Sequence, residues 1–254
     1  MSAKIPSPPC FHALISDIHG NIDALSAVLA DIGQYPCRGI ICLGDIVGYG
    51  PEPAACVQEV MNRCQTTVQG NHEAMLLMAS QFPSWNLGDA IAIPIELARL
   101  ELSSAQMQWL HALPAVAGLE TMTFSHASLS ELARFNYIHE PDDAREHFAL
   151  QKSFVSFQGH THVPAIWQEK QGEILCYSPG TSAIKLDSTC RYAVNVGSVG
   201  QPRDEIPDAC YALYDFERSL LLHRRVAYDI PRAQARFRRA NLPEVNARRI
   251  KLGQ

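Results

Sequence analysis

Five short motifs rich in Asp, His and Asn follow one another along this 254-residue chain, each directly after a run of strand-forming residues. Those runs cover residues 12–16, 39–43, 66–69, 121–124 and 154–158. The motifs are Asp17-Ile18-His19-Gly20-Asn21, Gly44-Asp45, Gly70-Asn71-His72-Glu73, Ser125-His126-Ala127 and Gly159-His160-Thr161-His162. Because open α/β folds place their sites at the carboxyl ends of strands, we expect these polar side chains to meet at one sheet edge.

The motifs supply two carboxylates, one amide oxygen and four imidazoles as candidate metal ligands. This mixture suits Mn, Fe, Zn or Co, whereas Mg and Ca prefer sites made only of oxygen ligands. No thiolate is included, which excludes a structural zinc cage. The sequence therefore predicts two divalent transition-metal ions, with Mn or Fe favoured. The candidate ligands are Asp17, His19, Asp45, Asn71, His126, His160 and His162.

Asp45 lies between the first and third motifs and is the natural bridging ligand. A carboxylate can bridge two cations about 3.5–4 Å apart with its two oxygens. Such a pair lowers the pKa of a shared water and holds the oxygens of an in-line phosphoryl displacement. The prediction is a hydrolase in which a metal-activated water or hydroxide attacks a phosphoester, with Asp45 in the catalytic machinery.

In their order, D-x-H, G-D, G-N-H, a lone His and G-H-x-H, the motifs resemble the calcineurin-like metallophosphoesterase family. The resemblance extends from about Leu14 to Arg203. It implies an α/β fold, a four-layer α/β/β/α sandwich of two mixed β-sheets flanked by helices. It implies one metal held by Asp17, His19, Asp45 and His162, and a second held by Asp45, Asn71, His126 and His160. By the same resemblance, His72 would face the leaving group as a general acid or charge stabiliser.

The rest of the sequence fits a single domain of residues 1–254, with a core of about 11–230. Apolar periodicity predicts helices over 22–34, 54–63 and 142–150, and a helical stretch over 73–113 broken at 83–88 and at Pro94. Ser103 to Gln106 resembles a capping box. Further strands are expected over 116–120, 121–125, 165–169, 173–177, 191–196, 211–216 and 219–228. The basic segment 231–254 is expected to be a solvated helix and tail, or alternatively an anion- or partner-binding tail.

Composition excludes several classes of protein. The net charge of −5 argues against a nucleic-acid polymer or an acidic membrane as partner. No run of about 18 apolar residues is present, and residues 1–9 lack the profile of a signal peptide. The eight Cys contain no C-x-x-C pair, so we expect reduced thiols. Together these features predict a cytoplasmic enzyme acting on a small phosphoester or nucleotide.

Differences from the family that this sequence resembles narrow the choice of substrate class. Its protein Ser/Thr phosphatases carry phosphate-gripping Arg residues after G-D and before G-N-H, whereas here residues 45–50 contain no Arg and Gln69 precedes Gly70. Phosphoprotein phosphatase activity is therefore disfavoured. The Gly-rich segment from Asn195 to Asp204 is expected to bind an anion through its amides and Arg203, or to be only a strand-ending turn. Tyr49 either stacks on a nucleobase or packs its own turn.

The stretches G-D-x-V-G-Y-G-P and G-S-V-G-Q-P-R-D resemble a bacterial and archaeal phosphodiesterase-like subgroup, some of whose relatives are diadenosine tetraphosphatase-like. This resemblance favours a dinuclear phosphodiesterase or nucleotide pyrophosphatase, with Asn71, Arg203 and Tyr49 contacting the substrate. The alternatives are a broad-specificity phosphomonoesterase and a non-catalytic, metal-bearing scaffold. The oligomeric state is left open by the sequence.

Overall fold

The computed structural model describes residues 10–78 and 88–254, in which the strands form two six-stranded sheets of mixed direction. In spatial order the first sheet contains β3 (Cys64–Thr67), β2 (Cys37–Cys42), β1 (Phe11–Ile15), β11 (Ala209–Asp215), β12 (Leu220–Val226) and β9 (Ile184–Lys185). The second contains β4 (Val116–Leu119), β5 (Met122–Ser125), β6 (Val155–Gln158), β10 (Arg191–Asn195), β7 (Ala165–Lys170) and β8 (Glu173–Tyr177). Of these strands, only the two-residue β9 was not predicted, because it is too short to show periodicity.

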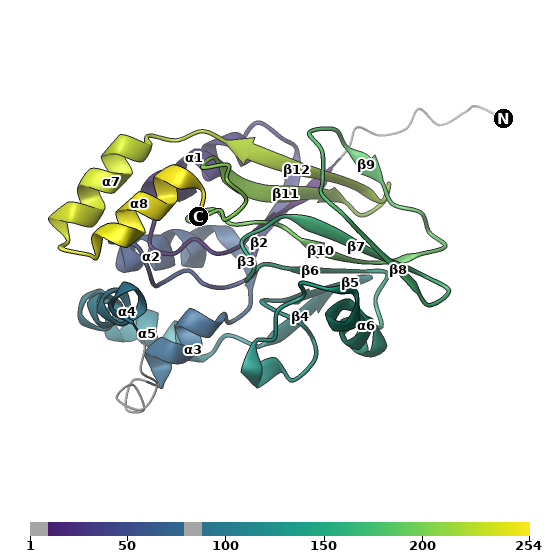
Figure 1. The fold of residues 1–254 in the computed structure, drawn as a ribbon, viewed down its shortest axis with the longest axis horizontal. Coiled ribbons are helices and arrows are strands. Elements are labelled where there is room, and N and C mark those ends of the chain that lie inside the picture. The colour runs from purple at the N-terminus through teal and green to yellow at the C-terminus, as the bar shows by residue number, and fades with distance from the viewer. Residues whose placement is uncertain (1–9, 79–87) are drawn as a thin grey trace.

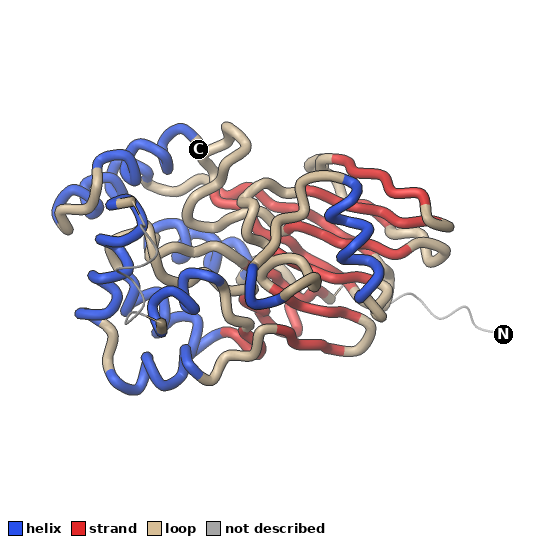
Figure 2. The backbone as a smooth tube through the Cα atoms, turned by 60° about the horizontal axis from the view of Figure 1, so that its bottom comes forward, coloured by secondary structure: helices blue, strands red, loops and turns tan. Residues whose placement is uncertain are grey.

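Helices flank both sheets, as the family resemblance implied. Helix α6 contacts β8 and β10 and crosses the outer face of the second sheet, whereas α1 contacts β11 and β12 of the first (Figures 1 and 2). The helices are α1 (Ile22–Ile32), α2 (Pro53–Arg63), α3 (Asn71–Leu77), α4 (Asp89–Glu101), α5 (Ser104–His111), the 3₁₀ turn η2 (Leu132–Arg134), α6 (Pro141–Leu150), α7 (Ile230–Arg239) and α8 (Glu244–Leu252). Ser103 forms the predicted capping box with Gln106.

Strand β1 shows how the sequence builds the layers. All five of its residues are buried, because alternate side chains serve different cores. Ala13 and Ile15 pack with the helices, whereas Leu14 joins the core between the two sheets. In that inner core the rings of Phe157 on β6 and Tyr214 on β11 lie 5.2 Å apart between centroids. Because both faces of β1 are packed, the position of its carboxyl end is fixed. The first motif begins there.

The parallel strands direct all five motifs to one region. In the first sheet, β1, β2 and β3 run parallel, and in the second, β5 and β10 both run parallel to β6. Each of the five motifs lies at the carboxyl end of β1, β2, β3, β5 or β6. The predicted placement of the motifs after strands is therefore confirmed.

One predicted helix break is wrong. Helix α4 continues through Pro94, which cannot donate the hydrogen bond that the Ala90 carbonyl would normally accept. The side-chain amide of Asn246 on α8 donates to that carbonyl instead, at 2.9 Å. The compensating donor comes from the far end of the chain, so local sequence patterns could not reveal it. The other predicted break, at 83–88, falls mostly on residues 79–87, which lie outside the described residues.

The basic C-terminal segment forms two packed helices. Helices α7 and α8 enclose their own small apolar core, which includes Phe237 and Ile250. Arg232 and Arg236 form ion pairs with Asp23, a buried residue of α1, and Arg236 also pairs with Glu52. Part of the basic charge therefore holds these helices against α1. The expectation of a solvated tail missed this because the acidic partners lie some 200 positions away.

Truncation of Phe237 should show how much this helix pair contributes. Phe237→Ala is expected to lower the free energy of unfolding by about 3–5 kcal/mol, because the ring is almost completely buried. Denaturant unfolding measures the change. Arg239→Ala, an exposed substitution on the same helix, should stay within about 0.5 kcal/mol of the wild type. An unchanged midpoint for Phe237→Ala would show that the packing of α7 adds nothing to stability.

Candidate metal centre

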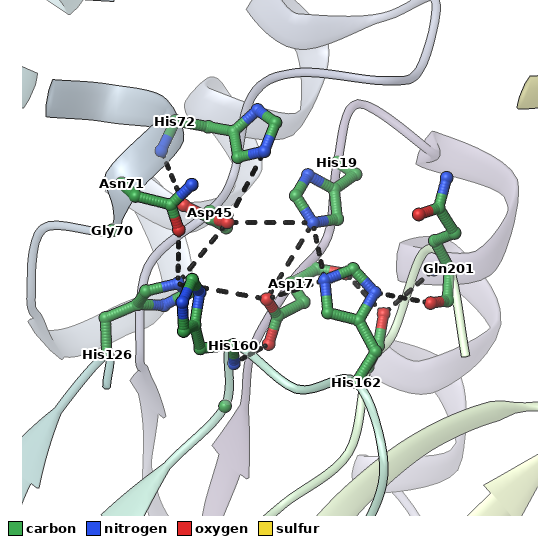
Figure 3. Close-up of polar contacts among 12 residues, drawn as sticks. Asp17, His19, Asp45, Gly70, Asn71, His72, His126, His160, His162 and Gln201 are labelled. Atoms are coloured by element: carbon green, nitrogen blue, oxygen red, sulfur yellow. Dashed lines mark hydrogen bonds and ion pairs between the residues drawn. The ribbon is translucent and has the colours of Figure 1, made fainter. Parts of the chain in front are cut away.

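The structure brings all seven candidate ligands together where the two sheets meet. Six are buried, and Asn71 is partly exposed. Figure 3 shows His126 and His160 on one side and His19 and His162 on the other, with the carboxylates between them. The residues therefore divide into two groups, which are described in turn.

The first group centres on Asp17. Its Oδ1 atom lies 3.1 Å from His162 Nε2 and 3.7 Å from His19 Nε2. The two imidazole Nε2 atoms are themselves 3.1 Å apart. Asp45 Oδ2 approaches the same group, at 3.7 Å from His19 Nε2. Three ligand atoms from Asp17, His19 and His162 thus lie within 4.8 Å of one another, a spacing that a metal ion can span.

The second group centres on His126. Its Nε2 atom lies 3.0 Å from Asn71 Oδ1, 3.2 Å from His160 Nδ1 and 3.3 Å from Asp45 Oδ2. The Asp45 Oδ2 atom is therefore close to both groups. This division matches the two ligand sets that the family resemblance implied.

Backbone carbonyls orient three of the four imidazoles. A carbonyl only accepts hydrogen bonds, so each paired Nδ1 carries the proton and each Nε2 presents a lone pair to the centre. The pairs are His19 with Val47 O at 3.0 Å, His126 with Leu43 O at 2.8 Å and His162 with Gln201 O at 2.6 Å. These bonds select the tautomer that binds a metal through Nε2.

The electrostatics of the cluster fit a cation. Asp17 Oδ1 is buried and lacks a hydrogen-bond partner among the described residues. Burial opposes protonation of His126, yet the adjacent Asp45 raises the pKa of that imidazole to about 10. Positive charge placed between Asp17 and Asp45 would offset the charge of these two buried carboxylates.

His72 lies beside the shared carboxylate. Its Nε2 atom is 3.9 Å from Asp45 Oδ2, and its backbone N–H donates to Asp45 Oδ1 at 2.9 Å. The ring packs against those of His19 and Tyr49, with centroids 4.8 Å away in each case. His72 also belongs to a group with His19 and Asp45 whose ligand atoms lie within 4.8 Å of one another. The geometry therefore admits His72 as an acid or as a further ligand, and metal content distinguishes these roles.

Most of the candidate ligands have an unusual, left-handed backbone conformation. Five of the seven have φ between 48° and 68°, a region that residues with a Cβ seldom adopt and that clusters at functional sites: Asp17, His19, Asp45, His160 and His162. Two motif glycines leave room for the carboxylates. A Cβ on Gly159 would lie 2.2 Å from Asp17 Oδ2, and one on Gly70 would lie 2.1 Å from Asp45 Oδ1. These contacts explain the Gly in G-N-H and in G-H-x-H.

Glu73 is a supporting residue to which the sequence analysis gave no role. Its buried carboxylate accepts hydrogen bonds from the backbone N–H groups of Gly70, Asp45, Ile46 and Val47, at 2.7–3.2 Å. It thereby joins the loop after β2 to the start of α3. The available signal was an acidic residue in the first turn of a helix that opens with G-N-H.

The Gly-rich segment 195–204 holds the start of the first motif in place through hydrogen bonds. The N–H groups of Val199 and Gly200 donate to the carbonyls of Ser16 and Asp17, each at 2.9 Å. The Ser198 hydroxyl also donates to the Asp17 carbonyl, at 2.8 Å. Because these amides are bonded within the protein, they are not available to an anion. The arrangement favours the strand-ending turn over the anion-binding nest.

Arg203 and Tyr49 lie together beside the first group. The Arg203 guanidinium is 5.6 Å from the centre of the Tyr49 ring and donates to Gln201 Oε1 at 2.8 Å. Tyr49 is only 7% exposed, and its ring meets His19 edge-on at 4.7 Å. This burial favours the packing role of Tyr49 over stacking on a nucleobase. Arg203 is half-buried.

Comparison with known proteins identifies the family. The sequence profile of the calcineurin-like phosphoesterase superfamily domain matches residues 11–219. The chain belongs to the calcineurin-like phosphoesterase superfamily. Membership supports a metal-dependent phosphoester hydrolase. No helix within residues 10–78 and 88–254 has the length and apolar character needed to cross a bilayer.

Relatives match almost the whole chain. The uncharacterized protein MJ0912 of Methanocaldococcus jannaschii is 35% identical over 246 residues, which cover 95% of this chain and 98% of that protein. A crystal structure of a metallophosphoesterase from Sphaerobacter thermophilus is 31% identical, with a TM-score of 0.84 over 97% of this chain and 100% of that one. The protein PH1004 from Pyrococcus horikoshii shares the fold, with a TM-score of 0.76 and 17% identity over 96% of this chain and 99% of that one.

Proposed function

We propose that the chain is a dinuclear phosphodiesterase or nucleotide pyrophosphatase that acts on a small substrate. The observation that carries this proposal is the position of Asp45 Oδ2, 3.7 Å from His19 Nε2 and 3.3 Å from His126 Nε2. One carboxylate placed between two ligand groups is the arrangement that a metal pair needs. Mn or Fe is the favoured metal, because imidazole and carboxylate ligands are mixed.

Each residue has a distinct part in the proposed reaction. When bound, two divalent ions would activate water and neutralise charge on the phosphoryl oxygens. His72 would hold a proton at Nε2 for the departing oxygen, or stabilise the charge that develops there. Asn71, which is partly exposed, would contact the substrate as well as a metal. Arg203 would bind a phosphate oxygen from the side of the first ligand group.

The charge of the site favours diesters over monoesters. A phosphate monoester carries one more negative charge than a diester. The protein phosphatases of the family bind this charged group with Arg residues. Here residues 45–50 contain no Arg, and Gln69 precedes Gly70. The chain therefore offers fewer cationic side chains to a dianion. A diester, with one negative charge, needs fewer of them.

Paired chromogenic substrates test the proposal. With Mn-loaded protein, kcat/KM for bis-p-nitrophenyl phosphate should exceed that for p-nitrophenyl phosphate. Asp45→Asn purified in the same way controls for contaminating enzymes. A preference for the monoester would favour the broad-specificity phosphomonoesterase. Absence of turnover with both compounds, and with dinucleoside polyphosphates, would contradict the proposed function.

Arg203 separates substrate binding from structural support. Removing a charged hydrogen bond costs about 1.5–3 kcal/mol, so Arg203→Ala should lose roughly 10- to 150-fold in kcat/KM. Arg203→Lys should recover only part of this loss, because an ammonium lacks the planar fork of a guanidinium. Both variants should keep their metals and nearly the wild-type Tm. Full activity with a lowered Tm would show that Arg203 only supports Tyr49 and Gln201.

A further inference from the structure

A pocket of about 360 Å³ opens beside the second ligand group. Asn71 and His160 form its polar end, next to the proposed metals. Its walls are largely apolar and come from two separate segments: Met75 on α3 with Met78 at its C-cap, and Phe135 with Tyr137 on the loop after β5. The volume lies within the range of small-molecule sites, which combine apolar walls with a few polar groups.

Helix α3 connects the pocket to the metal centre. Asn71 and Met75 are four residues apart and share one face of α3, and Met78 follows at the C-cap, three residues after Met75. A substrate whose phosphate meets Asn71 would therefore have its substituent beside the two methionines. Met78 is 42% exposed, so its side chain is accessible from solvent.

The opposite wall is held in a strained conformation. Phe135 has φ of 52° and Glu131 has φ of 47°, so non-glycine residues in left-handed conformation flank the turn η2. A bulky residue at positive φ is rare and is retained where the surrounding structure imposes it, commonly at ligand sites. The Phe135 ring lies 6.0 Å from His126, nearly perpendicular to it, and is only half-buried.

Tyr137 extends the aromatic wall over a candidate ligand. Its ring stacks on His160, with centroids 4.0 Å apart and planes 15° from parallel, while the residue stays 44% exposed. Arg134, also exposed, lines the same pocket and adds hydrogen-bond donors at its rim. Aromatic and thioether walls with a polar rim suit a flat heterocycle, which has apolar faces and polar edges.

We propose that this pocket receives the nucleobase of a nucleotide substrate and that Phe135 and Met75 determine the preference for it. The proposal rests on the proposed function, since it names the substrate class of the same site. Stacking of a base on an aromatic side chain contributes about 1–3 kcal/mol, which corresponds to about 5- to 150-fold in affinity.

The binding of AMP and of ribose 5-phosphate to Mn-loaded protein, measured by calorimetry, tests the proposal. The two compounds share the sugar and the phosphate and differ only in the base. AMP should bind about 5- to 150-fold more tightly. Phe135→Ala and Met75→Ala should each reduce this ratio, and the double variant should bring it close to one. Leu175→Ala, which removes an exposed apolar side chain from β8, should keep the wild-type ratio.

Three results would overturn the proposal. The first is equal affinity of the wild type for AMP and ribose 5-phosphate. The second is an affinity ratio that persists in the double variant. The third is binding of phenyl phosphate as tight as that of AMP, which would make the pocket a site for simple aryl groups. Because binding is measured without turnover, a retained AMP preference in a chain that hydrolyses no diester would count against the proposed function alone.

Discussion

Asp45→Asn is expected to lower the affinity for both metal ions by more than about 100-fold and to remove nearly all turnover. Substitution of supporting residues around a metal already costs about 10- to 100-fold in affinity, and Asp45 is proposed as a direct ligand of both ions. Its Oδ2 atom lies near His19 of one group and His126 of the other. An amide supplies one neutral oxygen and an N–H₂ donor, so it cannot replace a bridging carboxylate. Elemental analysis together with titration of Mn measures the change.

The control for this variant is another buried Asp. Asp31, in the last turn of α1, forms an ion pair with Arg224 and accepts a hydrogen bond from Tyr211. Asp31→Asn should lower stability and leave both metals bound. If Asp45→Asn instead bound two Mn ions with wild-type affinity, the bridging role would be wrong.

His72→Ala is expected to reduce kcat by about 10²–10⁴-fold while both metals stay bound, because positioned acids typically contribute that much. Its Nε2 atom is 3.9 Å from Asp45 Oδ2, close enough to act beside the metals without being needed to hold them. The loss should shrink for substrates that release nitrophenolate, since a stable anion needs no proton as it leaves. Single-turnover kinetics with alkyl and nitrophenyl leaving groups measure this difference.

Metal content decides between the two roles of His72. His111, which is exposed on α5, provides a matched control, and His111→Ala should keep wild-type activity and metals. A His72→Ala variant that loses one metal would show that His72 is a ligand, together with His19 and Asp45. In that case the decrease in kcat would no longer report on acid catalysis.

The sequence was sufficient to predict the fold class and the convergence of the candidate ligands because both depend on local patterns. Each motif follows a strand recognisable from a few neighbouring residues, and parallel strands bring their carboxyl ends together. The order of the motifs then restricted the fold to one family. Asp17 and His162 could thus be placed side by side, although they are separated by more than half of the chain.

What the sequence did not reveal depends on contacts between distant segments. Pro94 lies within a helix in which the Ala90 carbonyl accepts a hydrogen bond from the distant Asn246. The position of Glu73 in the first turn of α3 indicated a helix cap, but its hydrogen bonds to Ile46 and Val47 come from the distant loop that follows β2. The pocket wall at Phe135 belongs to an irregular segment with residues in left-handed conformation. Such a segment has no helix or strand periodicity from which its structure could be predicted.

The central claim is that two metal ions share one site and that both are needed. Titration of Mn into metal-free protein, with bound metal and diester hydrolysis followed in the same samples, tests it most directly. The account predicts two ions per chain, with activity that rises as the second ion binds and an electron paramagnetic resonance spectrum of a coupled Mn pair. Full activity at one ion per chain, with the spectrum of an isolated Mn ion, would contradict it.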